Sequence, residues 1–93
     1  MTAMSGYAIR LRTAQVVMDR VPERSKQILK LYDTVENIRH VCDDLALAVD
    51  TLEGFEERSD RDNRAEIEDF KEIIEKLKNE LIQIVDSHDV IGP

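Results

Sequence analysis

The sequence predicts an all-α protein built on a long antiparallel helical hairpin with heptad packing. Its 93 residues include only three Gly and two Pro, and no segment combines strand-like alternation with turn residues. Apolar residues repeat in 3-4 alternation along two segments, which indicates paired helices packed at shallow angles. We expect a single helical domain over residues 1–93, because a chain this short holds one hydrophobic core at most.

A short helix is expected first, over about residues 8–18. Its apolar stripe is weaker than those that follow and consists of Leu11, Ala14, Val17, Met18 and Val21. Pro22 ends this helix, because a proline in a helix interior removes one hydrogen bond and clashes with the preceding turn. Asp19 is the expected N-cap of the next helix, with Pro22 in the first turn, where its missing N–H costs nothing.

The next helix is expected to be long and continuous, over about residues 20–53. With Ile28 at heptad position a, the a positions hold Ile28, Val35, Cys42 and Val49, and the d positions hold Leu31, Ile38, Leu45 and Leu52. All of these side chains are apolar, so the helix has an unbroken face for a partner helix.

A turn over residues 54–63 is expected to follow. Gly54 suits the left-handed conformation that closes a helix, with Phe55 folding back toward Val49. Since a turn this short cannot return the chain to the far end of a long helix, the helices on either side of it are expected to be antiparallel.

The last helix is expected over about residues 64–87, and residues 88–93 are expected to fray. Asn63 and Glu66 resemble a capping box that opens this helix. Its heptad places Ile67, Ile74 and Leu81 at a, and Phe70, Leu77 and Ile84 at d.

Further apolar residues widen each stripe beyond the narrow seam of a two-stranded coiled coil. The e and g positions hold Tyr32, Val41, Ala46 and Ala48 on the long helix, and Ile73 and Val85 on the last one. Each helix therefore needs two neighbours, and the missing neighbour is the first helix folding back, a second copy of the chain, or another protein. We expect a homodimer that completes a four-helix bundle, or a complex with another helical protein. The candidate interface residues are Tyr32, Val41, Leu45, Ala48, Val49, Ile73, Leu77 and Val85.

Charge is distributed unevenly along the chain. Residues 1–30 carry six Lys or Arg and two acids, whereas residues 31–93 carry seven Lys or Arg and eighteen acids, within a net charge of −7. This balance opposes binding to nucleic acid, which requires a concentrated basic face. It permits the basic first third to dock on the acidic remainder, and it also permits an acidic inhibitor that mimics nucleic acid.

Residues 38–44, IRHVCDD, bring together the side-chain types of a metal or catalytic site. Cys42 lies at heptad position a and is expected to face the core, where a thiol acts as a small apolar side chain. His40 lies ~200° around the helix from it and is expected to contact Asp44 on an exposed face. His88 is expected to favour the helix C-terminus as a cation. We therefore predict no metal site in this segment or elsewhere.

Catalytic motifs are absent from the sequence. It contains no Gly-rich phosphate loop, nucleophile elbow, HExxH or CxxC, so we expect neither an enzyme nor a cofactor. One cysteine rules out an internal disulfide. Arg10, Arg12 and Gln15 interrupt any signal-peptide core, and no apolar run approaches the ~20 residues of a membrane span. A cytoplasmic protein with no membrane partner is expected, and export without a cleaved signal stays open.

The function favoured by these observations is that of a non-enzymatic interaction module, such as an adaptor, a chaperone or a regulatory subunit. In length, acidity and two-helix layout the chain also resembles the WXG100 group of type VII secretion. That resemblance implies a small helical hairpin that is exported. The chain has no Trp, its turn reads EGFEE, and Tyr32 and Glu36 form the one Tyr-x-x-x-acid pattern within a predicted helix, so no site residue is transferred from the group.

Overall fold

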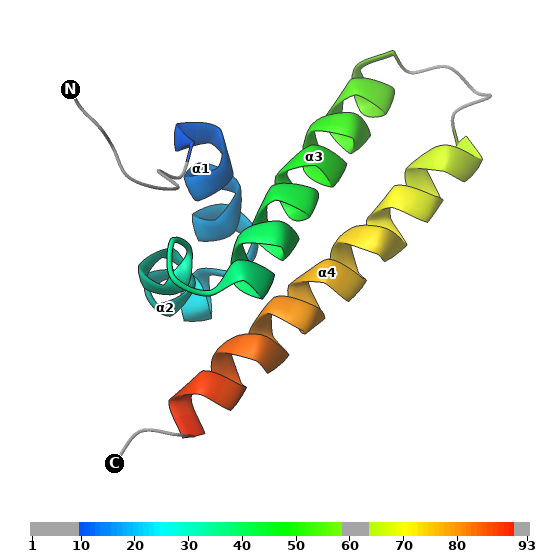
Figure 1. Ribbon diagram of the computed structural model, residues 1–93. Helices are drawn as coiled ribbons and strands as arrows, with labels where there is room; N and C mark the ends of the chain where they lie inside the picture. The colour runs from blue at the N-terminus through cyan, green and yellow to red at the C-terminus, as the bar shows by residue number, and fades with distance from the viewer. Residues whose placement is uncertain (1–9, 59–63, 91–93) are drawn as a thin grey trace.

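The computed structural model describes residues 10–58 and 64–90, and every regular element in these ranges is helical (Figure 1). The elements are α1 (Leu11–Arg20), the 3-10 segment η1 (Pro22–Arg24), α2 (Ser25–Leu31), α3 (Glu36–Arg58) and α4 (Arg64–Val90). Helices α3 and α4 pack side by side and run in opposite directions. The predicted all-α class and the helical hairpin are therefore confirmed.

Helix α3 lies between the other elements. Figure 1 shows α4 along one side of α3, with α1 and α2 on the other side, and α1 packs directly on α3. The second neighbour that the long helix needs is thus supplied by the first helix folding back. One core results, formed by Val16, Val17, Val21, Ile28, Tyr32, Ile38, Val41, Cys42, Leu45, Ala46, Ala48, Val49, Leu52, Ile74, Leu81 and Val85.

The heptad pattern identified the inward-facing side chains correctly. Every a and d residue of both registers is buried or half-buried, from Ile28 in α2 to Ile84 in α4. Burying such a stripe removes apolar surface from water. The free energy gained is roughly 25 cal/mol for each Å² buried, and it is the main contribution to the stability of the packed helices.

The prediction of one continuous helix over residues 20–53 is wrong, because the chain leaves helical geometry between α2 and α3. Residues 32–35 form a turn in which the N–H groups of Thr34 and Val35 donate to Leu31 O at 3.2 and 2.9 Å. The Thr34 hydroxyl donates to the same carbonyl at 3.5 Å. Asp33 and Thr34 are residues whose polar side chains compete with helical hydrogen bonding, and they mark the break.

The chain also divides before α2, at Pro22. Helix α1 ends at Arg20, so the predicted break at the proline is confirmed. The expected N-cap is wrong, because Asp19 lies inside α1, and Pro22 begins η1 rather than the first turn of a long helix. Of the first predicted helix, residues 8 and 9 lie outside the described residues.

The end of α3 differs from the prediction too. Gly54 does not close the helix, because α3 continues to Arg58. Phe55 packs against Phe70 of α4, with ring centroids 5.7 Å apart, instead of folding back toward Val49. This contact between helices outweighs a local capping signal, so the predicted turn over residues 54–63 begins too early.

Helix α4 begins at Arg64, where the last helix was predicted to begin. It extends to Val90, so residues 88–90 are helical rather than part of a frayed tail. Asn63, half of the predicted capping box, and residues 91–93 lie outside the described ranges.

Candidate functional site

The cluster over residues 38–44 is dispersed by the fold. Cys42 is fully buried, and burial, reinforced by the charge of Asp43, raises the pKa of its thiol to about 12. His40 is exposed, with Nε2 3.7 Å from Glu36 Oε2, one turn toward the N-terminus, and it does not form the predicted pair with Asp44. The thiol and the imidazole therefore cannot act on one ligand. This agrees with the sequence analysis, which placed Cys42 in the core and His40 on the exposed face.

Potential metal ligands do not converge in the part of the chain that the structure describes, where no group of three His, Cys, Asp or Glu side chains could hold an ion. His88 is exposed in the last turn of α4. The absence of a metal stays a prediction, which elemental analysis of the purified protein can test.

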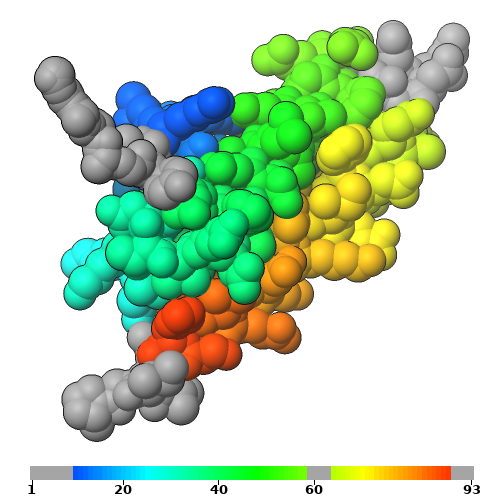
Figure 2. Space-filling model, viewed as in Figure 1, coloured from blue at the N-terminus to red at the C-terminus, as the bar shows by residue number. Residues whose placement is uncertain are grey.

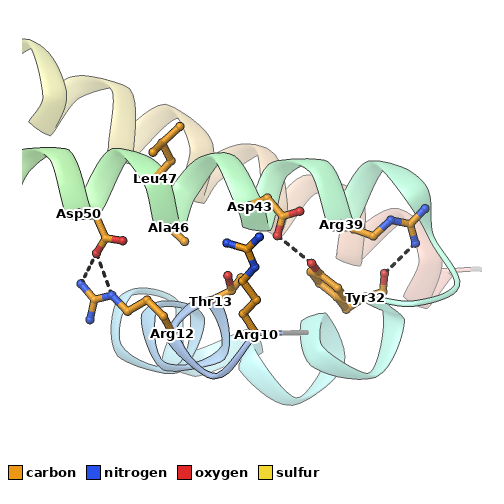
Figure 3. Close-up of a pocket in the computed structure, with 9 residues that line it drawn as sticks. All are labelled: Arg10, Arg12, Thr13, Tyr32, Arg39, Asp43, Ala46, Leu47 and Asp50. Carbon is orange, nitrogen blue, oxygen red and sulfur yellow. Dashed lines mark hydrogen bonds and ion pairs between the residues drawn. The ribbon is translucent and has the colours of Figure 1, made fainter. Parts of the chain in front are cut away.

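A polar pocket of about 470 Å³ lies where α1 and the α2–α3 connection meet α3 (Figure 3). Its lining consists of Arg10, Arg12, Thr13, Tyr32, Arg39, Asp43, Ala46, Leu47 and Asp50. The Tyr32 hydroxyl donates to Asp43 Oδ1 at 2.7 Å. Arg12 donates from Nε to Asp50 at 2.8 Å and from Nη2 to Glu53 at 2.9 Å. Figure 3 shows the side chain of Arg10, the residue before α1, extending toward α3 between these two groups.

These contacts join the N-terminal third of the chain to α3. Burial, followed by the hydrogen bond to Asp43, raises the pKa of Tyr32 to about 12, so this phenol stays protonated as a donor. At the other end of the molecule, Arg24 Nε donates to Asp86 of α4 at 3.1 Å. The basic first third thus docks on the acidic remainder within one chain, one of the arrangements that the charge distribution permits.

An apolar groove lies between α3 and α4. Its lining consists of Asp44, Leu47, Ala48, Thr51, Phe70, Ile73 and Leu77, around a volume of about 380 Å³. Leu47 is 67 % exposed and Ile73 is 42 % exposed, while Phe70 and Leu77 are half-buried. Figure 2 shows α3 (green) and α4 (yellow to orange) meeting along a seam, with α1 and α2 beyond α3. We call this surface the α3–α4 groove.

The predicted interface residues divide into two groups. Six are buried within the chain: Tyr32, Val41, Leu45, Ala48, Val49 and Val85. Val41, Ala48 and Val85, which occupy e or g positions, are buried in a chain that contains α1 and α2 besides the pair of long helices. Ile73 and Leu77 line the α3–α4 groove and retain exposed surface.

Two residues of the groove escaped the sequence analysis. Leu47 occupies heptad position f, which faces away from the seam. A large apolar residue at this position indicates apolar surface outside the seam, and the sequence analysis could have used it. Phe70 was assigned to the core as a d residue, but near the α3–α4 connection it is only half-buried and borders the groove.

Comparisons of the chain with protein-family models, with curated proteins and with solved structures found no match. The resemblance to the WXG100 group therefore stays an expectation. Among the helices that the structure describes, none is long and apolar enough to cross a membrane. The function is inferred from the chemistry of the groove and the polar pocket.

Proposed function

We propose that the chain is a non-enzymatic protein–protein interaction module that binds an α-helix in the α3–α4 groove. The observation that supports this most strongly is the exposure of Leu47 and Ile73 beside Phe70 and Leu77, on two helices that flank a hollow. A groove between two helices with exposed apolar side chains beside it accepts the apolar stripe of a third helix.

Binding would be driven by apolar burial. Covering Leu47 and Ile73 would gain roughly 1 to 2 kcal/mol for each side chain, before the cost of immobilising the partner. The bound helix would contact α3 and α4 together and, with α1, make a four-helix arrangement. A helical segment of another protein or of a second copy of this chain could supply it, so the homodimer predicted from the sequence is one form of this proposal.

The rest of the molecule supports a binding role rather than a catalytic one. Asp43 and Asp50 hold the Tyr32 hydroxyl and the Arg12 guanidinium, and Cys42 is enclosed in the core. Such a scaffold suits an adaptor, a chaperone or a regulatory subunit that needs no cofactor.

The test is a titration of isotope-labelled protein with an uncharged helical peptide. The probe is an Ala- and Gln-rich helix of about four turns with Leu at i, i+3, i+7 and i+10, followed by NMR. We expect resonance shifts concentrated on the groove residues, and binding weakened about tenfold by Leu47→Gln or Ile73→Gln, a loss of about 1.4 kcal/mol. Leu11→Gln and Met18→Gln change exposed apolar residues of α1 and serve as matched controls.

Self-association is measured in parallel by sedimentation equilibrium of the wild type and Ile73→Glu over a hundredfold dilution. A wild-type dimer that Ile73→Glu dissociates supports the homodimeric form. A monomer at every concentration, together with peptide binding that the groove variants leave unchanged, contradicts the proposed function.

A further inference from the structure

The rim of the α3–α4 groove is acidic. Asp44 lines the groove on α3, and Glu66, Asp69 and Glu80 lie seven, four and seven residues from Ile73 on α4, which places them on the same helix face. All four carboxylates are exposed. The side chains of His40, Arg58 and Lys76 border the same face, Arg58 seven residues from Thr51 on α3, so the four acids still outnumber the basic residues.

These rim acids differ from the acids of α3 and α4 that face the N-terminal third of the chain. Asp50 and Glu53 pair with Arg12, and Asp86 pairs with Arg24, so the N-terminal third neutralises that side of the hairpin. Within the described residues, Asp44, Glu66, Asp69 and Glu80 make no ion pair or hydrogen bond through their side chains. The groove thus combines an apolar floor with carboxylates that form no ion pair with the described part of the chain.

We propose that the occupant of the groove is a basic amphipathic helix, with an apolar stripe flanked by Lys or Arg. This inference rests on the proposed function and adds the charge of the partner. The apolar stripe would cover Leu47, Phe70 and Ile73, and the flanking cations would face the rim acids. Complementary charge of this kind increases the association rate and discriminates against acidic helices.

A second copy of the chain fits this groove less well. A two-fold symmetric contact through the groove would set the rim acids of one copy against the same acids of the other. Helix α1 exposes Leu11 and Met18, but its Arg12 is already paired with Asp50 and Glu53. Docking α1 into the groove of another copy would be a heterologous contact, which propagates into rings or larger oligomers.

The experiment uses three helical peptides with identical apolar positions, whose flanking residues are Gln, Lys or Glu. Calorimetric titration of the full chain should show the Lys peptide binding about tenfold tighter than the Gln peptide, and the Glu peptide binding more weakly. The difference should shrink as ionic strength rises from ~0.01 to ~1 M, because the screening length falls from about 30 to about 3 Å.

A variant with a neutral rim identifies the acids responsible. It carries Asp44→Asn, Glu66→Gln, Asp69→Asn and Glu80→Gln. The matched control has the same change in net charge at exposed acids on other faces, through Glu23→Gln, Asp33→Asn, Glu57→Gln and Glu72→Gln. We expect the neutral-rim variant to lose the preference for the Lys peptide over the Gln peptide while its affinity for the Gln peptide is unchanged. The control variant should retain most of that preference.

The outcomes separate the two proposals. Equal affinity for the three peptides, each dependent on Leu47 and Ile73, would overturn the charge inference and leave the interaction module standing. Binding of the Lys peptide that Leu47→Gln does not weaken would indicate general charge attraction and overturn both proposals, as would failure of all three peptides to bind. The wild type could also self-associate in a way that prevents peptide binding and that Leu11→Gln abolishes. This result would assign the groove to a second copy of the chain and overturn the charge inference.

Discussion

The Tyr32 hydroxyl donates a 2.7 Å hydrogen bond to Asp43 Oδ1, joining the break between α2 and α3 to a residue two turns into α3. From the same stretch of α3, Arg39 Nη1 donates at 3.3 Å to the Tyr32 carbonyl. Tyr32 is 6 % exposed, so its phenol would be costly to bury without a partner. These two contacts stabilise the change of direction that lets α1 and α2 cover α3.

Removing the hydroxyl tests this stabilisation. Tyr32→Phe should lower the free energy of unfolding by about 1 to 2 kcal/mol, because a hydrogen bond to a charged acceptor is lost while the ring stays packed. Asp43→Asn retains an acceptor and should cost less. Urea denaturation of both variants provides the measurement, and a Tyr32→Phe variant as stable as the wild type would show that Asp43 adds nothing at this site.

Alkaline pH should destabilise the protein through two buried groups. Folding raises the pKa of Cys42 from 9.0 and that of Tyr32 from 10.0, each to about 12, so both protons are held more tightly in the folded chain. Their contribution is complete below the ordinary values and is lost as the pH rises from about 9 toward 12, by up to about 1.4 kcal/mol per pH unit for each group. Because the net charge of the whole chain also changes at alkaline pH, the wild type is compared with the double variant Cys42→Ala, Tyr32→Phe. An equal slope of stability against pH in the two proteins would contradict this assignment.

The thiol of Cys42 should be protected in the folded protein. Its full burial predicts that a thiol reagent reacts slowly with native protein and rapidly in urea, and equal rates would place the sulfur outside the core. Cys42→Asp should destabilise by several kcal/mol, because a buried carboxylate there would lack a partner. His40→Ala, on the exposed face of the same helix, is the control and should stay within about 0.5 kcal/mol.

Gly54 distinguishes the observed helix from the predicted turn. Within α3, a Cβ added at Gly54 meets nothing within 4 Å. Gly54→Ala should therefore stabilise the protein by about 0.5 to 1 kcal/mol, since glycine is the more flexible residue in the unfolded chain. A helix that ended here with glycine in the left-handed conformation would instead be destabilised by alanine. The sign of the change in thermal unfolding decides between the two.

Leu45 and Leu47 offer a matched comparison between core and groove. Leu45 is fully buried, so Leu45→Ala should cost about 2 to 5 kcal/mol by leaving a cavity. Leu47→Ala removes the same atoms from a side chain that is mostly exposed, and it should stay within about 0.5 kcal/mol. A large loss of stability in Leu47→Ala would mean that this residue belongs to the core of the monomer rather than to a binding surface.

The sequence alone determined which side chains face inward. The 3-4 spacing of apolar residues from Ile28 to Ile84 places them on one side of each helix. The hydrophobic effect favours burial of that side in any arrangement of the helices. The same periodicity placed Cys42 in the core and His40 outside it, and the helix-breaking chemistry of Pro22 is local enough to be read from one residue.

Contacts between distant residues decided the rest. Helix α3 passes through Gly54 because Phe55 meets Phe70, and the connection before α3 is held by Tyr32 with Asp43 and Arg39, none of which a local pattern reveals. Most of the residues that were predicted to form an interface lie in the core, in a chain whose α1 folds back onto α3. The periodicity shows only that the long helix needs a second neighbour. Which apolar residues stay exposed, Leu47 and Ile73 above all, depends on where that neighbour lies, and only the packed chain specifies its position.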